Sequence, residues 1–227
     1  MAKITSIQEA IAQVKDGMTI MVGGFLGCGG PDKLMHALAE SGVKDLTVIC
    51  NDGGLPGVRL LGVQEVIHNG QVKHLIATHI GMNKEVGQMM NTGTMKVTLV
   101  PQGSLAEKIR AGGYGLGGVL TPTGLGTPVG VDSEDAANGA KKESIVIDGK
   151  EYLLERPIRA DIAFIYGSVA DKYGNVKIHG TARNFNTVMA TAADTVICQA
   201  DEVVEMIDPD EVLIQGVLVD YIVGGKN

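Results

Sequence analysis

Two amide side chains and one glycine-rich loop are the parts of this sequence that could take part in chemistry. Asn51 and Gln102 each follow a short apolar run that is typical of a buried strand. In an open α/β sheet the ligand crevice lies beyond the carboxyl ends of the strands, and an amide there can donate a hydrogen bond to a developing oxyanion. The residues alone favour a simpler interpretation, in which Asn51 caps a turn and Gln102 caps a helix.

The glycine-rich loop Gly23–Pro31 lies between an apolar run at Met18–Val22 and a helical pattern that begins at Pro31. Backbone N–H groups at such a turn, and at the start of the following helix, form a site for phosphate or carboxylate. A tight strand–helix connection without a ligand is the alternative. The five glycines of the loop are more than a turn needs, which favours the anion site.

Short apolar runs alternate with amphipathic segments along the first half of the chain, and these elements must position the loop and the amides. The predicted strands cover residues 18–22, 46–50, 74–78 and 96–100. The predicted helices cover residues 6–14, where Ser6 begins a capping box, 31–41, 83–90 and 104–111. We therefore expect an α/β fold with a largely parallel, open sheet that is flanked by helices.

The second half of the chain differs from the first in its composition. Residues 112–130 are rich in glycine and almost without charge, and the polar stretch 132–142 follows and is interpreted as variable. Residues 145–154 predict a β-hairpin around Asp148-Gly149. Further strands are expected at residues 162–169 and 195–198. The chain shows no internal repeat and no linker, so we expect one domain over residues 1–227, with the hairpin as an excursion.

The composition excludes several classes of function. The net charge is −7 without a basic stripe, which excludes nucleic-acid binding through phosphate neutralisation. Cys28, Cys50 and Cys198 fit neither a disulfide framework nor a zinc pattern, and the five histidines show no ligand spacing, so no metal is expected. No apolar run approaches the length of about 18 residues that spans a membrane, and no signal peptide is evident. We expect a cytoplasmic protein without a membrane partner.

The spacing of residues 16–31 resembles the signature of the alpha subunits of family I coenzyme A (CoA) transferases. Its order is Asp-Gly, two residues, three apolar residues, Gly-Gly-Phe, three residues, Gly, one residue, Pro. Segments 51–54, 101–104, 110–127 and 180–186 are similar to the same family. The resemblance runs from about Ile7 to Val223 and includes the acetate or butyrate–acetoacetate CoA-transferases of bacteria.

The resemblance implies an activity and a set of site residues. Enzymes of this family move CoA between a short-chain acyl-CoA and a free acid such as acetate, butyrate or acetoacetate, with ping-pong kinetics. Asn51 and Gln102 would line the site around a catalytic glutamate. CoA is then a substrate, and no permanently bound cofactor is implied. The residues that would contact CoA are Gly24, Phe25, Leu26, Gly27, Cys28, Gly29 and Gly30.

The catalytic glutamate of this family belongs to a Ser-Glu-Asn-Gly motif on the beta subunit. The most similar string here begins at Ser133-Glu134, but it continues differently, so we expect Glu134 at the surface and not in the site. The resemblance therefore implies a beta-subunit partner that carries the glutamate, in an α2β2 heterotetramer.

Two other functions remain open. A sugar-phosphate isomerase or deaminase would also need a phosphate loop, but no Asp, Glu or His cluster accompanies the loop to act as its acid–base pair. A regulatory domain that senses CoA or another metabolite is the alternative outside the enzymes, and it would function without a partner.

Overall fold

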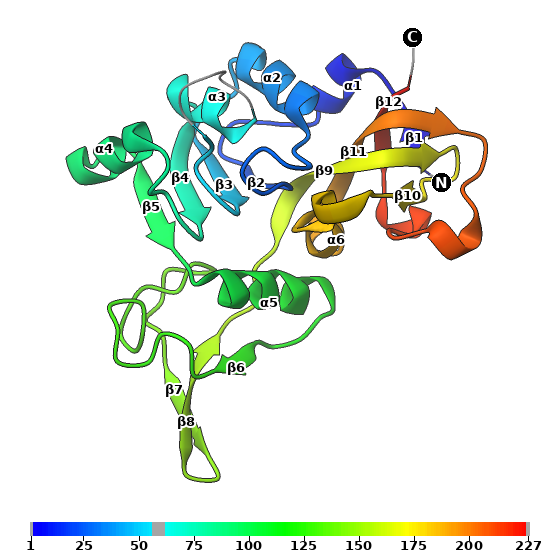
Figure 1. Ribbon diagram of the computed structural model, residues 1–227. Helices are drawn as coiled ribbons and strands as arrows, with labels where there is room; N and C mark the ends of the chain where they lie inside the picture. Colours follow the sequence, from blue (N-terminus) through cyan, green and yellow to red (C-terminus); the bar gives the residue numbers. More distant parts are fainter. Residues whose placement is uncertain (1, 56–61, 226–227) are drawn as a thin grey trace.

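The computed structural model describes residues 2–55 and 62–225 of the chain. Within these residues, nine strands form one sheet in the order β1-β12-β11-β9-β2-β3-β4-β5, with β10 paired to β9 (Figure 1). Every pairing is parallel except that of β10 with β9, which confirms the predicted α/β class. The strands are β1 (Lys3–Ile4), β2 (Thr19–Val22), β3 (Leu46–Cys50), β4 (Val72–Ala77), β5 (Lys96–Leu99), β9 (Ala160–Asp171), β10 (Val176–Lys177), β11 (Ala193–Val204) and β12 (Tyr221–Gly224).

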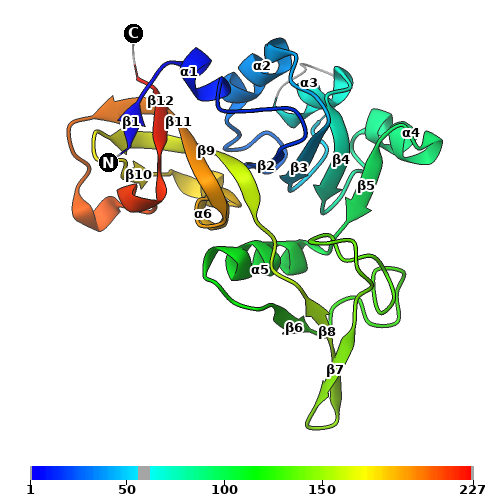
Figure 2. The ribbon, with the colours of Figure 1, turned by 180° about the vertical axis from the view of Figure 1, so that it is seen from behind.

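Helices cover both faces of this sheet (Figures 1 and 2). On β2, Ile20 and Val22 are buried among α1–α4, whereas Met21 is buried on the opposite face among α5 and α6. Burial on both faces explains why the strands are continuous apolar runs. The helices are α1 (Ile7–Ile11), α2 (Asp32–Ser41), α3 (Val63–His68), α4 (Lys84–Thr92), α5 (Gln102–Gly113) and α6 (Asn186–Met189), with short 3₁₀ turns at Gly180–Arg183, Pro209–Glu211 and Gly216–Leu218. None of the helices described is long and apolar enough to span a bilayer.

Local signals set several of the helix ends. The Ser6 side chain accepts a hydrogen bond from the Glu9 amide at 3.1 Å, as the predicted capping box requires. Gly42 ends α2 in the left-handed conformation, with φ of 75°. The prediction was wrong at α5, which begins at Gln102 and not at Ser104, because Pro101 occupies the N-cap position.

A second, antiparallel sheet of three strands carries the predicted hairpin, which points away from the main sheet (Figure 1). Its strands are β6 (Val119–Thr121), β7 (Ser144–Ile147) and β8 (Lys150–Glu155). Asp148 and Gly149 both have positive φ, as a two-residue hairpin turn requires. Strand β6 was not predicted, because its three residues are too few to show a period. Helix α5 contacts both β6 and α6, so we propose to treat the two sheets as one domain.

The polar stretch 132–142, interpreted from sequence as variable, holds buried charges. The Lys108 ammonium lies 2.9 Å from both carboxylate oxygens of Asp135 and 3.0 Å from Glu155. The Lys142 ammonium lies 2.8 Å from the other oxygen of Glu155. All four side chains are at most 3% exposed. Two cations therefore balance two carboxylates, and they tie α5 to the second sheet.

Replacement of Lys108 tests this network. Lys108→Met keeps the approximate volume but removes the cation that balances the buried Asp135 and leaves Oε2 of Glu155 without its Lys108 donor, so we expect the free energy of unfolding to fall by about 3–5 kcal/mol. The matched control is Lys96→Met, which breaks the half-exposed pair with Glu134 and should cost less than about 1 kcal/mol. Chemical denaturation measures both values, and equal effects would contradict a structural role for the buried network.

Candidate functional site

The glycine-rich loop begins where the strand order of the main sheet reverses. From β2 the chain adds β3, β4 and β5 on one side, and it then returns to place β9 on the other side of β2. In open α/β sheets ligands bind at this reversal, beyond the carboxyl ends of the strands. The Gly23 amide donates a hydrogen bond to the Phe164 carbonyl of β9 at 2.9 Å, which fastens the start of the loop to this point.

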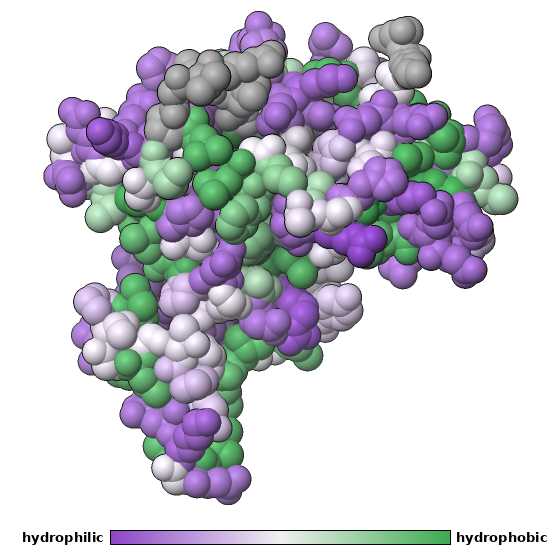
Figure 3. Space-filling view, viewed as in Figure 1, coloured by the Kyte–Doolittle hydropathy of each residue, from purple (hydrophilic) through white to green (hydrophobic). Residues whose placement is uncertain are grey.

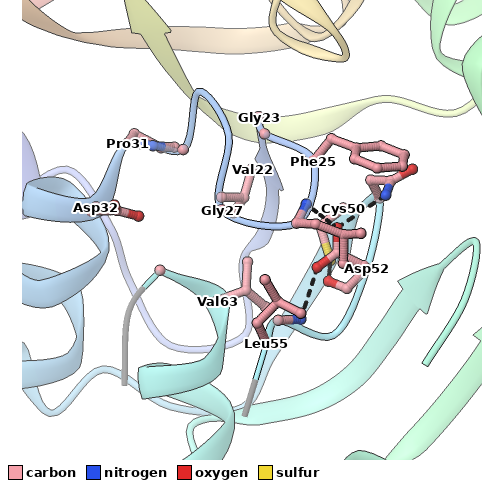
Figure 4. Close-up of a pocket in the computed structure, with 16 residues that line it drawn as sticks. Val22, Gly23, Phe25, Gly27, Pro31, Asp32, Cys50, Asp52, Leu55 and Val63 are labelled. Carbon is pink, nitrogen blue, oxygen red and sulfur yellow. Dashed lines mark hydrogen bonds between the residues drawn. The ribbon is translucent and has the colours of Figure 1, made fainter. Parts of the chain in front are cut away.

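A cavity of about 400 Å³ opens beside the loop (Figure 4). Its lining consists of residues 22–27, 30–32, 50–52, 54–55 and 62–63. The cavity thus joins most of the predicted CoA-contact residues to Asn51. The surface near the middle of this side of the molecule is largely apolar or pale, whereas hydrophilic residues gather toward the outer parts (Figure 3).

A tight turn shapes the tip of the loop. Phe25 and Cys28 exchange two backbone hydrogen bonds of 3.0 and 2.9 Å, and the two residues between them both have positive φ. Gly27 adopts this conformation without strain, but Leu26, with φ of 45°, has a Cβ that disfavours it by about 1–3 kcal/mol. Other contacts must therefore hold Leu26 in place.

Side chains from the segment after β10 clamp the loop. Asn184 accepts a hydrogen bond from the Gly24 amide at 3.2 Å and donates one to the Cys28 carbonyl at 3.0 Å. Asn186 donates to the Gly29 carbonyl at 2.9 Å. A Cβ on Gly29 would approach the Ala182 backbone to 2.8 Å, so the close approach requires glycine. Both asparagines lie in segment 180–186, whose likeness to the family was the signal available in the sequence.

Two amides of the helix part of the predicted anion site already have a partner. The amides of Lys33 and Leu34, in the first turn of α2, donate to the Gln199 side-chain oxygen at 2.8 and 3.2 Å. The amides of Gly27, Gly29 and Gly30 make no hydrogen bond with a residue that the structure describes. Anion binding by these loop amides stays a prediction.

The structure brings the two predicted amides together. The Gln102 side-chain nitrogen donates to the Asn51 side-chain oxygen at 2.7 Å, and the Thr78 hydroxyl donates to the Asn51 carbonyl at 2.8 Å. Asn51 is 1% exposed, whereas Gln102 is exposed at the start of α5. The two residues lie after β3 and β5, which are separated by one strand, so the longer Gln102 side chain reaches across β4.

Asp52 is a cavity residue that the sequence analysis missed. Its carboxylate accepts hydrogen bonds from the amides of Leu26 and Gly54, each at 2.9 Å, and from the Asn51 side chain at 3.0 Å. Its backbone carbonyl accepts a hydrogen bond from the Cys50 thiol. Burial, reinforced by the charge of Asp52, raises the pKa of that thiol far above its usual range, so Cys50 remains a neutral thiol.

The other candidate groups lie outside the cavity lining. Glu134 is exposed, as predicted, and it forms an ion pair with Lys96. Cys28 is exposed, and its sulfur lies 3.4 Å from the Thr181 hydroxyl. In the described ranges, no three His, Cys, Asp or Glu side chains are grouped closely enough to hold a metal ion.

The fold and the cavity together define an α/β protein with a cavity at the reversal of its strand order. Comparison with known families narrows this class. The sequence matches the model of the coenzyme A transferase family over residues 4–225, so the chain belongs to this family, as its motifs predicted.

Individual relatives agree with this assignment. The chain is 47% identical to acetate CoA-transferase subunit alpha of Escherichia coli K12, over 97% of this chain and 96% of that protein. It is also 47% identical to the acetoacetyl-CoA:acetate/butyrate CoA transferase alpha subunit of Clostridium acetobutylicum, over 98% of this chain and 97% of that protein. An acyl-CoA transferase of E. coli O157:H7, solved as a thioester complex with CoA, superposes with a TM-score of 0.84 at 25% identity. The match covers 98% of this chain but only 47% of that one.

A methyl group at Gly23 should disturb the clamp. The Cβ of Gly23→Ala would lie 1.9 Å from the Asn186 side-chain oxygen, which also accepts the Tyr166 amide. Because this crowding displaces Asn186, we expect a loss of stability of about 1–3 kcal/mol in thermal unfolding. The control is Gly87→Ala in α4, where a Cβ meets nothing within 4 Å and should leave stability equal or higher. A stable Gly23→Ala protein would show that the clamp is not rigid.

Proposed function

We propose that this chain is the alpha subunit of a CoA transferase that moves CoA between a short-chain acyl-CoA and a free carboxylic acid. The observation that carries the proposal is that one cavity joins the loop and Asn51, the two features that the family resemblance assigns to the site. Identity of 47% over nearly the whole length to two proteins named as alpha subunits supports it. Their names favour acetate, butyrate and acetoacetate as the acids.

The residues of this chain would bind and orient the acyl-CoA. The loop residues 24–30 would contact CoA, with the N–H groups of Gly27, Gly29 and Gly30 open to phosphate oxygens. Phe25 and Leu55, which are 37% and 41% exposed at the cavity, offer apolar contact to the uncharged part of the substrate. Asn51 would donate a hydrogen bond to the thioester oxygen as negative charge develops on it, and Gln102 would orient the Asn51 amide.

The nucleophilic carboxylate would come from a beta subunit. Its glutamate attacks the acyl carbon, CoA leaves as the thiolate, and an acyl–glutamyl anhydride forms. The thiolate then attacks the glutamyl carbonyl, which releases the acid and leaves CoA as an enzyme thioester. The second acid reverses these steps and departs as the new acyl-CoA. The α2β2 assembly and the cytoplasmic location are parts of the same proposal.

Reconstitution tests the proposal. The chain is co-expressed with a family beta subunit that carries a Ser-Glu-Asn-Gly motif, and transfer from acetoacetyl-CoA is measured with acetate and with butyrate as acceptors. We expect transfer by the complex and none by either subunit alone. Turnover of ribose 5-phosphate by the chain alone would favour the isomerase alternative. CoA binding by the chain alone, with no transfer by any complex, would favour the sensor.

Replacement of Asn51 tests its assigned role. Asn51→Ala removes the proposed oxyanion donor, so we expect kcat of the complex to fall at least about tenfold with assembly intact. Asn138→Ala is the control, since Asn138 is exposed and its side chain contacts only a local turn. Steady-state kinetics and size-exclusion chromatography of both complexes give the comparison, and an unchanged kcat for Asn51→Ala would remove it from the mechanism.

A further inference from the structure

We propose that Asp52 is a positioning residue that couples the CoA-binding loop to the Asn51 amide. Its carboxylate touches both elements, and no motif of the sequence assigned it a role. The inference rests on the proposed function, because it assumes that Asn51 acts in acyl transfer.

One oxygen of Asp52 serves both elements. This oxygen, Oδ2, accepts the Leu26 amide at 2.9 Å and the Asn51 side-chain nitrogen at 3.0 Å. The other oxygen, Oδ1, accepts the Gly54 amide at 2.9 Å. Figure 4 shows Asp52 among these dashed hydrogen bonds, between the loop and Leu55. Movement of the loop tip at Leu26 therefore moves the group that orients Asn51.

A carboxylate is suited to this position because it only accepts hydrogen bonds. It obliges Asn51 to present its nitrogen toward Asp52, while the Gln102 side-chain nitrogen donates to the oxygen of Asn51 at 2.7 Å. The two contacts fix which end of the Asn51 amide faces each neighbour. Asn51 has a second N–H hydrogen that makes no hydrogen bond with a described residue. The fixed orientation of the Asn51 amide sets the direction in which this hydrogen points.

Burial strengthens the coupling. Asp52 is 8% exposed, so water offers its carboxylate little competition, and three N–H donors replace its lost hydration. Leu26, one of those donors, has a positive φ that its side chain disfavours. The hydrogen bond from the Leu26 amide to Asp52 acts on the strained residue itself and helps to offset this local strain. Asp52 thus holds the loop tip in the same conformation that leaves the neighbouring glycine amides open.

The test is a double-mutant cycle in the complex with the beta subunit. Asp52→Asn keeps the size of the side chain but places an NH₂ group against one of the three donors. We expect kcat to fall at least about tenfold and KM for acyl-CoA to rise. If Asp52 acts through Asn51, then adding Asp52→Asn to Asn51→Ala should lower kcat by less than about threefold more.

The control is Asp161→Asn. Asp161 also accepts a backbone amide, that of Thr19 at 2.7 Å, but it lies at the opposite ends of the strands, and its replacement should leave kcat unchanged. If Asp52→Asn fails to assemble, Asp52→Ser replaces it in the cycle, because a hydroxyl keeps the local turn to Gly54 but is too short for Leu26 and Asn51.

The outcomes separate the two proposals. An unchanged kcat for the Asp52 variant, or kcat losses that multiply in the double variant, overturns the coupling while the proposed function stands. A lower melting temperature with normal kcat assigns Asp52 a structural role only and also overturns it. If the wild-type complex transfers no CoA, or Asn51→Ala is fully active, the proposed function or the role of Asn51 fails, and the coupling fails with it.

Discussion

The parallel pairing of β2 with β9 is the constraint on which the site depends. Ile20 and Val22 of β2 lie in register with Ile162 and Phe164 of β9, although most of the chain separates the two strands. The pairing reverses the strand order at this point, and neighbouring connections therefore leave the sheet in opposite directions and open a crevice. It also brings the segment that follows β9 against the loop that follows β2.

The glycine-rich loop illustrates how backbone polar groups are satisfied when side chains are few. Glycines let the chain turn sharply, but they have no side chain that could form a hydrogen bond with the backbone groups of the loop. Asn184, Asn186 and Asp52 supply these partners from two other parts of the chain. The loop is thereby held in one conformation, and the amides of Gly27, Gly29 and Gly30 are left without a hydrogen-bond partner among the described residues. This preorganisation lowers the entropy that ligand binding must otherwise offset.

The second sheet is joined to helix α5 by a cluster of buried charges. The cluster of Lys108, Lys142, Asp135 and Glu155 is buried and balanced, and none of its members lines the cavity. Its members come from α5, β8 and the stretch between β6 and β7, so it fixes how the hairpin meets the helix. Helix α5 also begins with Gln102, which contacts Asn51. The same helix therefore links the charge cluster to the site.

The sequence by itself determined the features that depend on neighbours along the chain. Strand β3 has its predicted bounds, Ser6 caps the start of α1 as predicted, and the spacing of the loop identified the family. Only the tertiary structure decided that Gln102 contacts Asn51, that Gln199 occupies the amides at the start of α2, and that Asp135 is buried. Apolar periodicity and capping residues depend on the conformational preference of a single segment of the chain. Hydrogen-bond partners and burial depend on which distant segments the sheet places side by side.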